Sequence, residues 1–465
     1  MKKYKPKRYT IKKAHSRKPV IDNWAGYLTV FVIMLYVLAF GYYQSNWFVL
    51  SGFNFTYLII IIPLWTIDGF KAFLESFAKR GYKTSEEDLS KITVVIACKD
   101  GEEVIGATIR SLLKKFKPEQ IILASNGSTD DTCHIAQGYG VITLDIKSPL
   151  GKVRAINYAL RHVNTPYVLL LDDDTLVGDA VMPTGLLEEG YEGVAFRVLV
   201  KVSNWITKIQ MYEYHKSTDL GKRYHNNRAS VQNVSGAIGL FELKQLKTQI
   251  KRHSGEFSGE DLQRTLLIHL AQNSKGVVLS DSTVYTQPPT TLLALYRQRS
   301  FGWFPGLYAN FHNYCKILTR DQMPFALRFD AFYNIFLVMI LDILRVLSLP
   351  ILVFYPWYFV IMYITYLILE TMSFLKSKSK EPFWVVLVYP LYGLFGFFTR
   401  SSAFATFTYR RLTVKFTRRE FLDDYRSVGT TFKIIALLVT ITAISSILIL
   451  NILYYYTKPF LTLGS

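Results

Sequence analysis

Uninterrupted apolar stretches lie at both ends of this chain, and a segment of mixed character separates them. Residues 24–43 and 47–67 contain no charged side chain. Each stretch is close to the roughly 20 residues that an α-helix needs to cross the hydrocarbon core of a bilayer. The first stretch is too long for the apolar core of a signal peptide, lacks a small-residue cleavage site and is followed directly by the second. We therefore predict two transmembrane helices within residues 24–70.

Apolar stretches return in the C-terminal part, so residues 331–465 are predicted to form a second membrane region. Residues 332–354 and 355–375 predict a pair of helices, and residues 432–456 predict a final span. The run at 383–398 is shorter and contains proline and glycine, which favours a re-entrant segment over a crossing.

Two opposite charges interrupt one of these apolar runs. Asp342 and Arg345 are three residues apart, a spacing that brings two side chains together on one face of a helix. Charged residues inside a membrane usually face the interior of a helix bundle or a watery path. The simpler interpretation is an internal ion pair, and the alternative is the lining of a polymer channel.

The distribution of basic residues sets the predicted orientation. Nine lysine and arginine residues precede position 24, and Asp22 is the only acidic residue among them. Basic flanks remain in the cytoplasm, so residues 1–23, the central segment and the basic stretch at 400–431 are predicted to be cytosolic. Both ends of 383–398 then face the cytosol. The formal net charge of +19 follows from this topology and from anionic lipid, and no nucleic-acid recognition motif accompanies it.

The central segment alternates between strand and helix patterns. Short apolar runs at 92–97, 121–124, 141–144 and 167–171 predict buried strands. Helical patterns occupy the intervals between them. Such alternation indicates an α/β domain with a mostly parallel sheet and helices on both faces. Ligands of these sheets bind beyond the carboxyl ends of the strands.

Acidic and polar residues follow three of these strands. Asp100 follows the first strand, Asn126 follows the second, and Asp172 and Asp174 follow the fourth. A carboxylate cluster is costly unless a cation or hydrogen-bond donors compensate it. Oxygen ligands of this kind suit Mg²⁺ or Mn²⁺, which share phosphate oxygens with a substrate. The sequence thus predicts a metal and a phosphorylated ligand here, although a capping residue or a plain turn would give similar local patterns.

Six motifs in the central segment carry a family resemblance. Their order resembles that of family 2 glycosyltransferases, which have the GT-A nucleotide-sugar-binding fold. This resemblance implies a cytosolic GT-A domain over 71–295, inserted between transmembrane α-helices. With its flanking spans, the whole chain resembles the membrane-embedded processive branch, which includes hyaluronan, chitin and cellulose synthases. The motifs are IACKD ending at Asp100, SNGSTDDT at 125–132, GKVRAINYA at 151–159, LLLDDDT at 169–175, SGAIGLF at 235–241 and SGED at 258–261.

The resemblance implies roles for individual residues. Asp261 would be the general base, its neighbour Glu260 would lie at the acceptor, and Asp174 would bind Mg²⁺ or Mn²⁺. One departure is the pair Ser125–Asn126, where many members carry two acidic residues. The residues implied in donor binding are Asp100 at the uridine, Asn126, Lys152 near the phosphates and Asp172 near the diphosphate and ribose.

Elementary chemistry supports these roles. A sugar hydroxyl is a poor nucleophile at neutral pH, and a carboxylate that takes its proton contributes about 10²–10⁴-fold to the rate. The departing nucleotide diphosphate develops negative charge, which a divalent cation and basic side chains stabilise. A single base with in-line attack inverts the anomeric centre. The alternative for Glu260 and Asp261 is an acidic pair placed at a helix N-terminus by the helix dipole.

A second motif follows the domain, in a segment at 296–330 that we predict to form interfacial amphipathic helices. Gln298, Arg299 and Trp303 resemble the Q-x-x-R-W signature of processive synthases, but Gly302 stands where arginine is usual and the spacing is one residue longer. The resemblance implies that Gln298 and Arg299 contact the donor diphosphate and that Trp303 lies under the acceptor sugar. The alternative is a surface helix anchored in the bilayer by its aromatic residues.

Together these features predict an inverting β-glycosyltransferase in the plasma membrane, with several spans and a cytosolic catalytic domain. The stretch at 400–431 resembles the cytosolic gating loop of the synthases, although a plain basic loop would look the same. The expected partners are a UDP-sugar, a growing polysaccharide and the lipid bilayer, with secretion through the protein's own channel. A non-processive enzyme acting on a lipid acceptor, such as polyprenyl phosphate or ceramide, is the alternative. An inactive subunit or transporter is a third interpretation.

Overall fold

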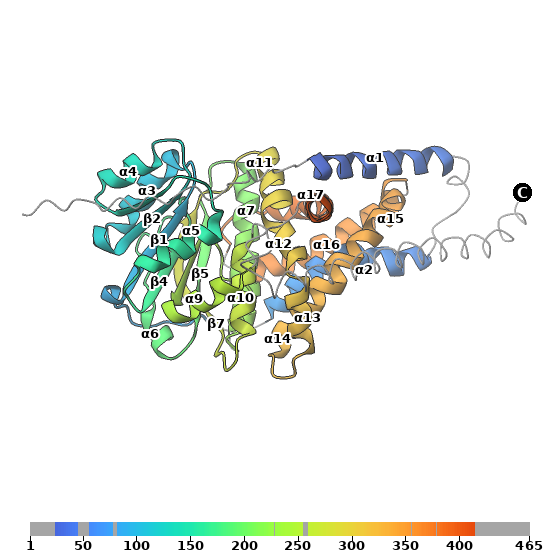
Figure 1. Cartoon of the computed structure of the whole chain (residues 1–465). Helices are drawn as coiled ribbons and strands as arrows, with labels where there is room; N and C mark the ends of the chain where they lie inside the picture. The colour runs from blue at the N-terminus through green and yellow to red at the C-terminus, as the bar shows by residue number, and fades with distance from the viewer. Residues whose placement is uncertain are drawn as a thin grey trace, which may run out of the picture.

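A computed structural model of the chain has two adjoining parts, a layered α/β part and a part made only of helices (Figure 1). The α/β part is built on a seven-stranded sheet. The helical part lies against one side of it, with several helices roughly along one direction and others crossing them. The structure describes residues 24–44, 55–77, 81–226, 228–253, 259–354, 356–377 and 379–413.

The sheet confirms all four predicted strands and adds three more. Strands β1, β2, β3 and β4 pair in parallel. Strand β6 runs antiparallel to both β4 and β5, and β7 is parallel to β5. The sheet is therefore mixed, whereas the sequence pattern predicts a mostly parallel one. Its order is β3 (Ile142–Ile146), β2 (Ile121–Asn126), β1 (Ile92–Cys98), β4 (Tyr167–Leu171), β6 (Ile238–Glu242), β5 (Gly193–Val200) and β7 (Val277–Thr286).

Two apolar layers cover the two faces of the sheet. Alternate residues of β1 point to opposite faces, so Val94 and Ile96 belong to one core and Val95 to the other. Helix α3 (Glu102–Leu112) packs into the first core, and α5 (Lys152–Ala159) packs into the second. This arrangement confirms the α/β architecture with helices on both faces.

Further helices complete the α/β part and connect it to the rest. The long helix α7 stands between the sheet and the helical part (Figure 1). It continues into a π-helical segment, η4, and then into the short helix α8. These elements are α4 (Thr132–Gly138), α6 (Thr184–Glu188), α7 (Trp205–His215), η4 (Lys216–Lys222), α8 (Arg223–Asn226), α9 (Leu243–Arg252) and α10 (Glu260–His269), with short 3₁₀ turns η1 (Leu89–Lys91), η2 (Pro118–Gln120) and η3 (Leu160–His162).

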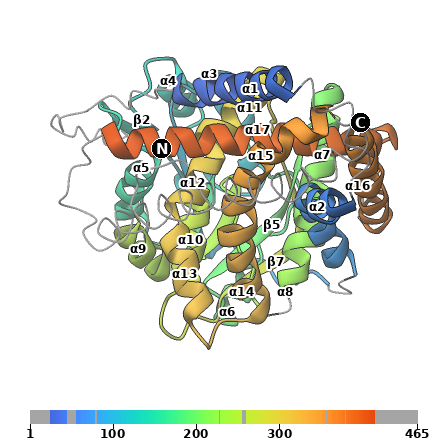
Figure 2. The ribbon, with the colours of Figure 1, turned by 90° about the vertical axis from the view of Figure 1, so that its right-hand side faces the viewer.

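The helical part brings the two ends of the described chain together. Figure 2 shows α17 running across this part, with α1 beside it and α16 at one end. Its elements are α1 (Trp24–Gln44), α2 (Phe55–Ser76), α11 (Leu292–Arg297), η5 (Gln298–Trp303), α12 (Phe304–Ala309), α13 (Phe311–Thr319), α14 (Phe325–Phe332), η6 (Tyr333–Ile340), α15 (Leu341–Phe354), α16 (Pro356–Lys376) and α17 (Trp384–Thr413).

The last described helix differs from its prediction. The sequence pattern ends an apolar segment at 398 and starts a loop at 400, but α17 is continuous from Trp384 to Thr413. The glycines within this range do not end the helix. At Gly393 a Cβ atom would lie 2.9 Å from the ring of Tyr366, so the glycine allows α16 to approach closely. The predicted boundary between a re-entrant segment and a loop is therefore wrong. The remainder of the 400–431 stretch, the predicted span 432–456 and residues 1–23 lie outside the described residues.

By length and composition, one helix among the described residues, α16, is suited to cross a membrane. A shorter apolar run, Trp24–Ala39, lies within α1. The predicted ion pair inside the apolar region is present, since Arg345 donates to Asp342 over 2.7 Å. Arg400 from α17 donates to the same carboxylate over 2.6 Å. Buried charge in the helical part is thus compensated by side chains from separate helices.

Candidate active site

A lysine joins two carboxylates at the carboxyl end of the sheet. Lys152 is the first residue of α5, Asp172 follows β4, and Glu260 is the first residue of α10. The Lys152 Nζ atom lies 2.6 Å from Asp172 Oδ1 and 2.6 Å from Glu260 Oε1. Three segments that are far apart in the sequence therefore meet at one ammonium group.

Gly236 lies at the centre of this cluster. A Cβ atom at this position would lie 3.4 Å from Asp172 Oδ2, 3.7 Å from Asp261 Oδ2 and 3.7 Å from Lys152 Nζ. The backbone N–H of Gly236 also donates to Asp261 Oδ2 over 2.9 Å. The absence of a side chain at Gly236 thus keeps open the space that these charged groups face. Four of the predicted site residues, Lys152, Asp172, Glu260 and Asp261, are brought together here.

Asp174 lies beside this cluster and turns toward β7. Its Oδ1 atom accepts a hydrogen bond of 3.0 Å from the Thr286 hydroxyl, and the side chain is partly buried. Asp173, between the two site aspartates, points the other way, toward Cys98 and Gly101. The alternation along Asp172, Asp173 and Asp174 therefore presents the first and third carboxylates to the site.

The cluster holds more negative charge than Lys152 neutralises. Burial raises the pKa of Asp172 to about 7, with Glu260 and Asp174 adding to the effect and Lys152 opposing it. Burial also raises the pKa of Asp174, assisted by the charge of Asp173. Glu260 behaves in the opposite way: burial would raise its pKa, but Lys152 and Arg264 outweigh it and lower the value to about 2. A further cation would relieve the excess charge at the two aspartates.

The residues at this edge fit a divalent cation. The groups available are carboxylate oxygens, which Mg²⁺ and Mn²⁺ prefer. Burial and, to a lesser extent, neighbouring carboxylates raise the pKa values of Asp172 and Asp174, so a bound cation would stabilise their ionised forms. Asp174 would hold such an ion, because only one of its oxygens is engaged with Thr286 and its neighbour Asp172 is already paired with Lys152.

A second group of potential metal ligands lies elsewhere, between α2, α8 and α14. The ligand atoms of Glu75, His225 and Asp330 lie within 4.8 Å of one another. Lys71 pairs with both Glu75 and Asp330, and His225 Nε2 lies 2.7 Å from Asp330. Because a lysine already supplies the positive charge, this group is a buried polar junction between the two parts of the molecule, separate from the candidate active site.

Asp100 and Asn126 lie at the same edge of the sheet but are engaged locally. Asp100 adopts a left-handed backbone conformation, with φ of 52°, and its Oδ1 accepts from the Thr129 N–H over 2.9 Å. Asn126 is buried, and its Oδ1 accepts from the Leu150 N–H over 2.7 Å. No contact among the described residues joins either side chain to Lys152, so their predicted roles at the donor stay predictions.

The Q-x-x-R-W-like segment forms the π-helical element η5. A π-helical turn contains more residues than an α-helical turn, which accommodates the extra residue between Gln298 and Trp303. The guanidinium of Arg299 lies over the Trp303 ring, 3.5 Å from its centroid, and Arg299 donates to Glu213 over 2.6 Å. The Trp303 carbonyl oxygen faces Gly259, where a Cβ atom would lie 3.3 Å away. Element η5 thus packs directly against the start of α10, next to Glu260 and Asp261.

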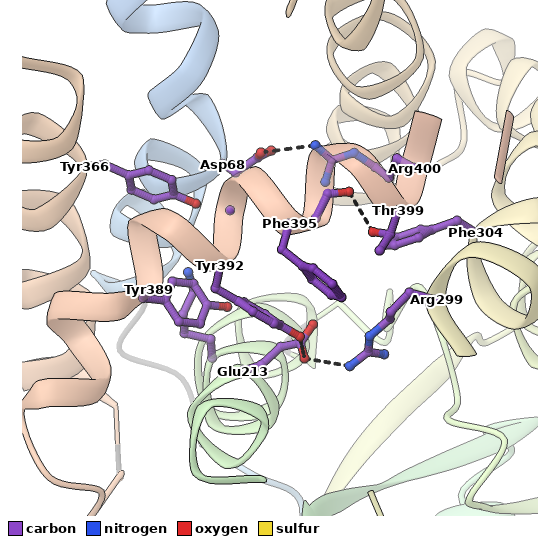
Figure 3. Close-up of a pocket in the computed structure, with 13 residues that line it drawn as sticks. Asp68, Glu213, Arg299, Phe304, Tyr366, Tyr389, Tyr392, Phe395, Thr399 and Arg400 are labelled. Atoms are coloured by element: carbon purple, nitrogen blue, oxygen red, sulfur yellow. Dashed lines mark hydrogen bonds and ion pairs between the residues drawn. The ribbon is translucent and has the colours of Figure 1, made fainter. Parts of the chain in front are cut away.

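A cavity of about 140 Å³ opens behind Arg299, between α7, α16 and α17. Figure 3 shows its aromatic and charged side chains directed toward a common space, with the ion pair between Glu213 and Arg299 at one side. The Tyr392 hydroxyl donates to the same Glu213 carboxylate over 2.9 Å. Sequence reasoning missed Glu213 and Tyr392, because each comes from a helix that no motif marks. The lining includes Asp68, Lys216, Tyr366, Tyr389, Phe395 and Arg400.

Comparison with known proteins agrees with this geometry. Residues 90–306 match the family model described as "Glycosyltransferase like family 2". This region of the chain is therefore similar to family 2 glycosyltransferases. This region has a GT-A-like mixed α/β sheet, and its family model and curated relatives are those of glycosyltransferases. The predicted enzyme class and the coarse fold are therefore confirmed.

The curated relatives are similar to this chain over part of their length. Poly-β-1,6-N-acetyl-D-glucosamine synthase of Staphylococcus aureus (strain COL) is 26% identical over 195 residues, which are 40% of this chain and 47% of the relative. The Staphylococcus epidermidis synthase is 24% identical over 261 residues, 52% of this chain and 59% of the relative. The chain thus spans about half the length of the curated relatives it matches.

Two solved structures illustrate the structural neighbourhood of the glycosyltransferase. The mannosyltransferase PcManGT from Pyrobaculum calidifontis, in complex with GDP-Man and Mn²⁺, is 11% identical with a TM-score of 0.47, and the match covers 77% of this chain and 97% of that one. TarS of S. aureus is 16% identical with a TM-score of 0.35, covering 54% of this chain and 43% of that one.

Replacing Lys152 by methionine tests the charge balance of the site. We expect the variant to unfold at a lower temperature, and its deficit relative to the wild type to be larger at pH 8 than at pH 6. A carboxyl group with a raised pKa, such as Asp172 at about 7, binds its proton more tightly in the folded chain than in the unfolded chain, where the value is about 4. The folded chain therefore loses stability relative to the unfolded chain as pH rises from the unfolded pKa of this carboxyl group to its folded pKa. Removal of the lysine enlarges this loss of stability.

Thermal unfolding at both pH values measures the effect. Lys244→Met, at an exposed position of α9, is the matched control and should show little dependence on pH. If Lys152→Met lowers the unfolding temperature equally at pH 6 and pH 8, the result would argue against an ammonium group shared by Asp172 and Glu260.

Proposed function

We propose that this glycosyltransferase transfers a sugar from a UDP-sugar to a growing saccharide chain with inversion at the anomeric carbon. The observation that carries the proposal is the setting of Asp261. Its Oδ2 atom accepts from the Gly236 N–H over 2.9 Å and from Asn233 Nδ2 over 3.3 Å. No hydrogen bond within the described part of the chain reaches its Oδ1 atom. A carboxylate held by one oxygen and open at the other is suited to accept a proton.

The proposed step is a single displacement. The acceptor hydroxyl oxygen bonds to the anomeric carbon of the donor, and its proton passes to Asp261 Oδ1. The bond between the anomeric carbon and the diphosphate oxygen breaks, and UDP departs with the bonding electron pair. Lys152, one cation within the carboxylate cluster, would attract the diphosphate. A bound Mg²⁺ or Mn²⁺ supplies further charge stabilisation to the departing diphosphate, and Asp174 would hold it.

The sugar we propose is N-acetylglucosamine, and the acceptor a polymer of it. The curated relatives are named as synthases of poly-β-1,6-N-acetyl-D-glucosamine. The cavity behind Arg299 supports a saccharide acceptor, because aromatic faces and hydroxyl groups such as those of Tyr389 and Tyr392 suit sugar rings. Secretion of the product through the protein's own helices is part of this proposal.

We also propose that the helical part is embedded in the plasma membrane, with the glycosyltransferase domain in the cytosol. Helix α16 has a suitable length and composition. Helix α1 exposes a row of large apolar side chains, an expensive arrangement in water. The basic residues that precede position 24 favour a cytosolic N-terminus. The exposed apolar residues of α1 are Trp24, Leu28, Phe31, Val32, Leu35 and Leu38.

Asp261→Asn tests the base. We expect turnover to fall by about 10²–10⁴-fold, because the amide keeps the shape of the side chain but cannot take the acceptor proton. Release of UDP from the purified protein is measured with a panel of UDP-sugars, and product size separates a polymer from a glycosylated lipid. Asp281→Asn, an exposed aspartate on β7, is the matched control. Undiminished turnover in Asp261→Asn would exclude the proposed mechanism.

Asp174→Ala tests the metal. We expect loss of Mn²⁺-stimulated turnover and loss of Mn²⁺ binding in the presence of UDP, because the ion loses the carboxylate that we propose as its ligand. Mn²⁺ binding is followed by electron paramagnetic resonance, which does not depend on activity. Asp179→Ala, an exposed position nearby, should behave like the wild type. Retained Mn²⁺ binding in Asp174→Ala would assign the ion to other residues.

Membrane insertion is tested by extraction and by protease access. We expect the full chain to stay in the membrane pellet after alkaline carbonate treatment and to dissolve in detergent, because α1 and α16 bury apolar surface in lipid. In sealed inside-out vesicles, protease should cleave the α/β part. Release of the chain by carbonate alone, or protection of the α/β part in these vesicles, would contradict the proposed topology.

A further inference from the structure

The loop that precedes Gly236 holds a second polar side chain at the candidate active site. Resting on the proposed function, we propose that Asn233 both orients the base Asp261 and binds the acceptor sugar, with its amide oxygen accepting a hydrogen bond from an acceptor hydroxyl. The amide nitrogen would thus act on the base Asp261, and the amide oxygen would act on the acceptor sugar that gives its proton to that base.

The position of Asn233 is fixed by its neighbours in the loop. The Val231 N–H donates to the Val277 carbonyl over 3.2 Å, which ties the loop to β7. The Val234 N–H donates to the Thr265 hydroxyl over 3.0 Å, which ties it to α10. Both valine side chains are buried. Asn233 therefore lies between two anchored residues, and its side chain is held at the start of α10 without a long flexible connection.

The orientation of the Asn233 amide is set by the carboxylate beside it. Its Nδ2 atom lies 3.3 Å from Asp261 Oδ2. An ionised carboxylate has only acceptors, so the amide must present its donor group there, and its oxygen must point elsewhere. The Gly236 N–H donates to the same Asp261 oxygen over 2.9 Å. Two donors on Oδ2 turn the other oxygen, Oδ1, toward the space where the acceptor would react.

The Asn233 amide oxygen has no hydrogen-bond donor among the described residues, although it is shielded from solvent. A buried acceptor without a partner costs free energy, and such groups are uncommon in native structures. A purely structural asparagine would be expected to use both ends of its amide. A sugar acceptor carries several hydroxyl donors, so it supplies the missing partner when it binds.

The other charged or titratable groups near Asp261 do not perform this role. Lys222, on η4, acts on Asp261 through its charge: burial lowers the pKa of Lys222 to about 8, and Asp261 opposes that effect. Tyr314, on α13, is also within electrostatic range of Asp261. Neither residue hydrogen-bonds to the Asp261 carboxylate. Within the described part of the chain, the direction of that carboxylate is therefore set by Asn233 and Gly236.

Two substitutions separate the two functions of the amide. Asn233→Ala removes both its donor and its acceptor, whereas Asn233→Asp keeps an oxygen acceptor but places a carboxylate against Asp261. Steady-state kinetics of the full chain in detergent, with UDP-N-acetylglucosamine as the donor and a β-1,6-linked N-acetylglucosamine trisaccharide as the acceptor, give KM for each substrate and kcat. Asn164→Ala is the matched control, because Asn164 is exposed and precedes β4 at the opposite end from Asp172.

We expect both variants to lower kcat by about 10- to 100-fold, because a misdirected base loses rate at that scale. Asn233→Ala should also raise KM for the trisaccharide by about tenfold, the effect of one lost hydrogen bond. Asn233→Asp should leave that KM within about twofold of the wild type, since an oxygen acceptor is still present. KM for UDP-N-acetylglucosamine should be unchanged in both variants, the unfolding temperature should be unchanged in Asn233→Ala, and Asn164→Ala should match the wild type throughout.

Three outcomes would overturn the inference. Wild-type kcat and KM in Asn233→Ala would show that the amide has no role in transfer. A fall in unfolding temperature that accounts for lost activity in both variants would reduce Asn233 to a structural residue. A wild-type protein that releases no nucleoside diphosphate from any donor would refute the proposed function, and this inference with it. The first two results leave the proposed function standing, so the two failures are distinguishable.

Discussion

The ammonium group of Lys152 is the interaction on which the candidate site depends. It lies 2.6 Å from a carboxylate at the end of β4 and 2.6 Å from another at the start of α10. Without it, two buried negative charges would repel each other and the N-terminus of α10 would move away from the sheet. Because Asp261 follows Glu260 directly, this bridge also fixes the distance between the candidate base and β4, which Asp172 and Asp174 follow. The same bridge neutralises only part of the local charge, which leaves the need for a further cation.

The sequence was informative where burial leaves a local pattern. Strands β1, β2 and β4 are buried almost throughout, so each reads as a short apolar run, and the polar and acidic residues at their ends mark the functional edge. The pairing of β4 with β6 could not be predicted, because Leu171 and Ile238 are opposite each other although many residues separate them in sequence. The same holds for Asn233 and Glu213, whose importance depends on contacts with distant elements. Motif order identified Lys152, Asp172, Glu260 and Asp261, and folding brought them together.

Two departures from local expectation have the same physical origin. Proline and glycine at 383–398 favour a re-entrant segment in the sequence, yet α17 is continuous through Gly393, where the tight contact with Tyr366 leaves no room for a side chain. The extra residue between Gln298 and Trp303 was interpreted as a defect in a motif, yet η5 absorbs it in a π-helical turn. In both places tertiary packing decides the local structure, and intrinsic propensity is the weaker influence. Both places also line or adjoin the cavity behind Arg299, where close contacts between helices set the available space.

The helical part does more than lie beside the glycosyltransferase domain. Element η5 contacts α10 through the Trp303 carbonyl and Gly259, and it contacts α7 through Arg299 and Glu213. The residues that flank Asp261 are thus supported from the helical side, while Lys152 supports them from the sheet side. A displacement of the helical part relative to the sheet would move Trp303 and, with it, the first turn of α10. The shape of the cavity and the position of Asp261 are therefore mechanically linked, because the short element η5 forms a wall of the cavity and packs against the start of α10.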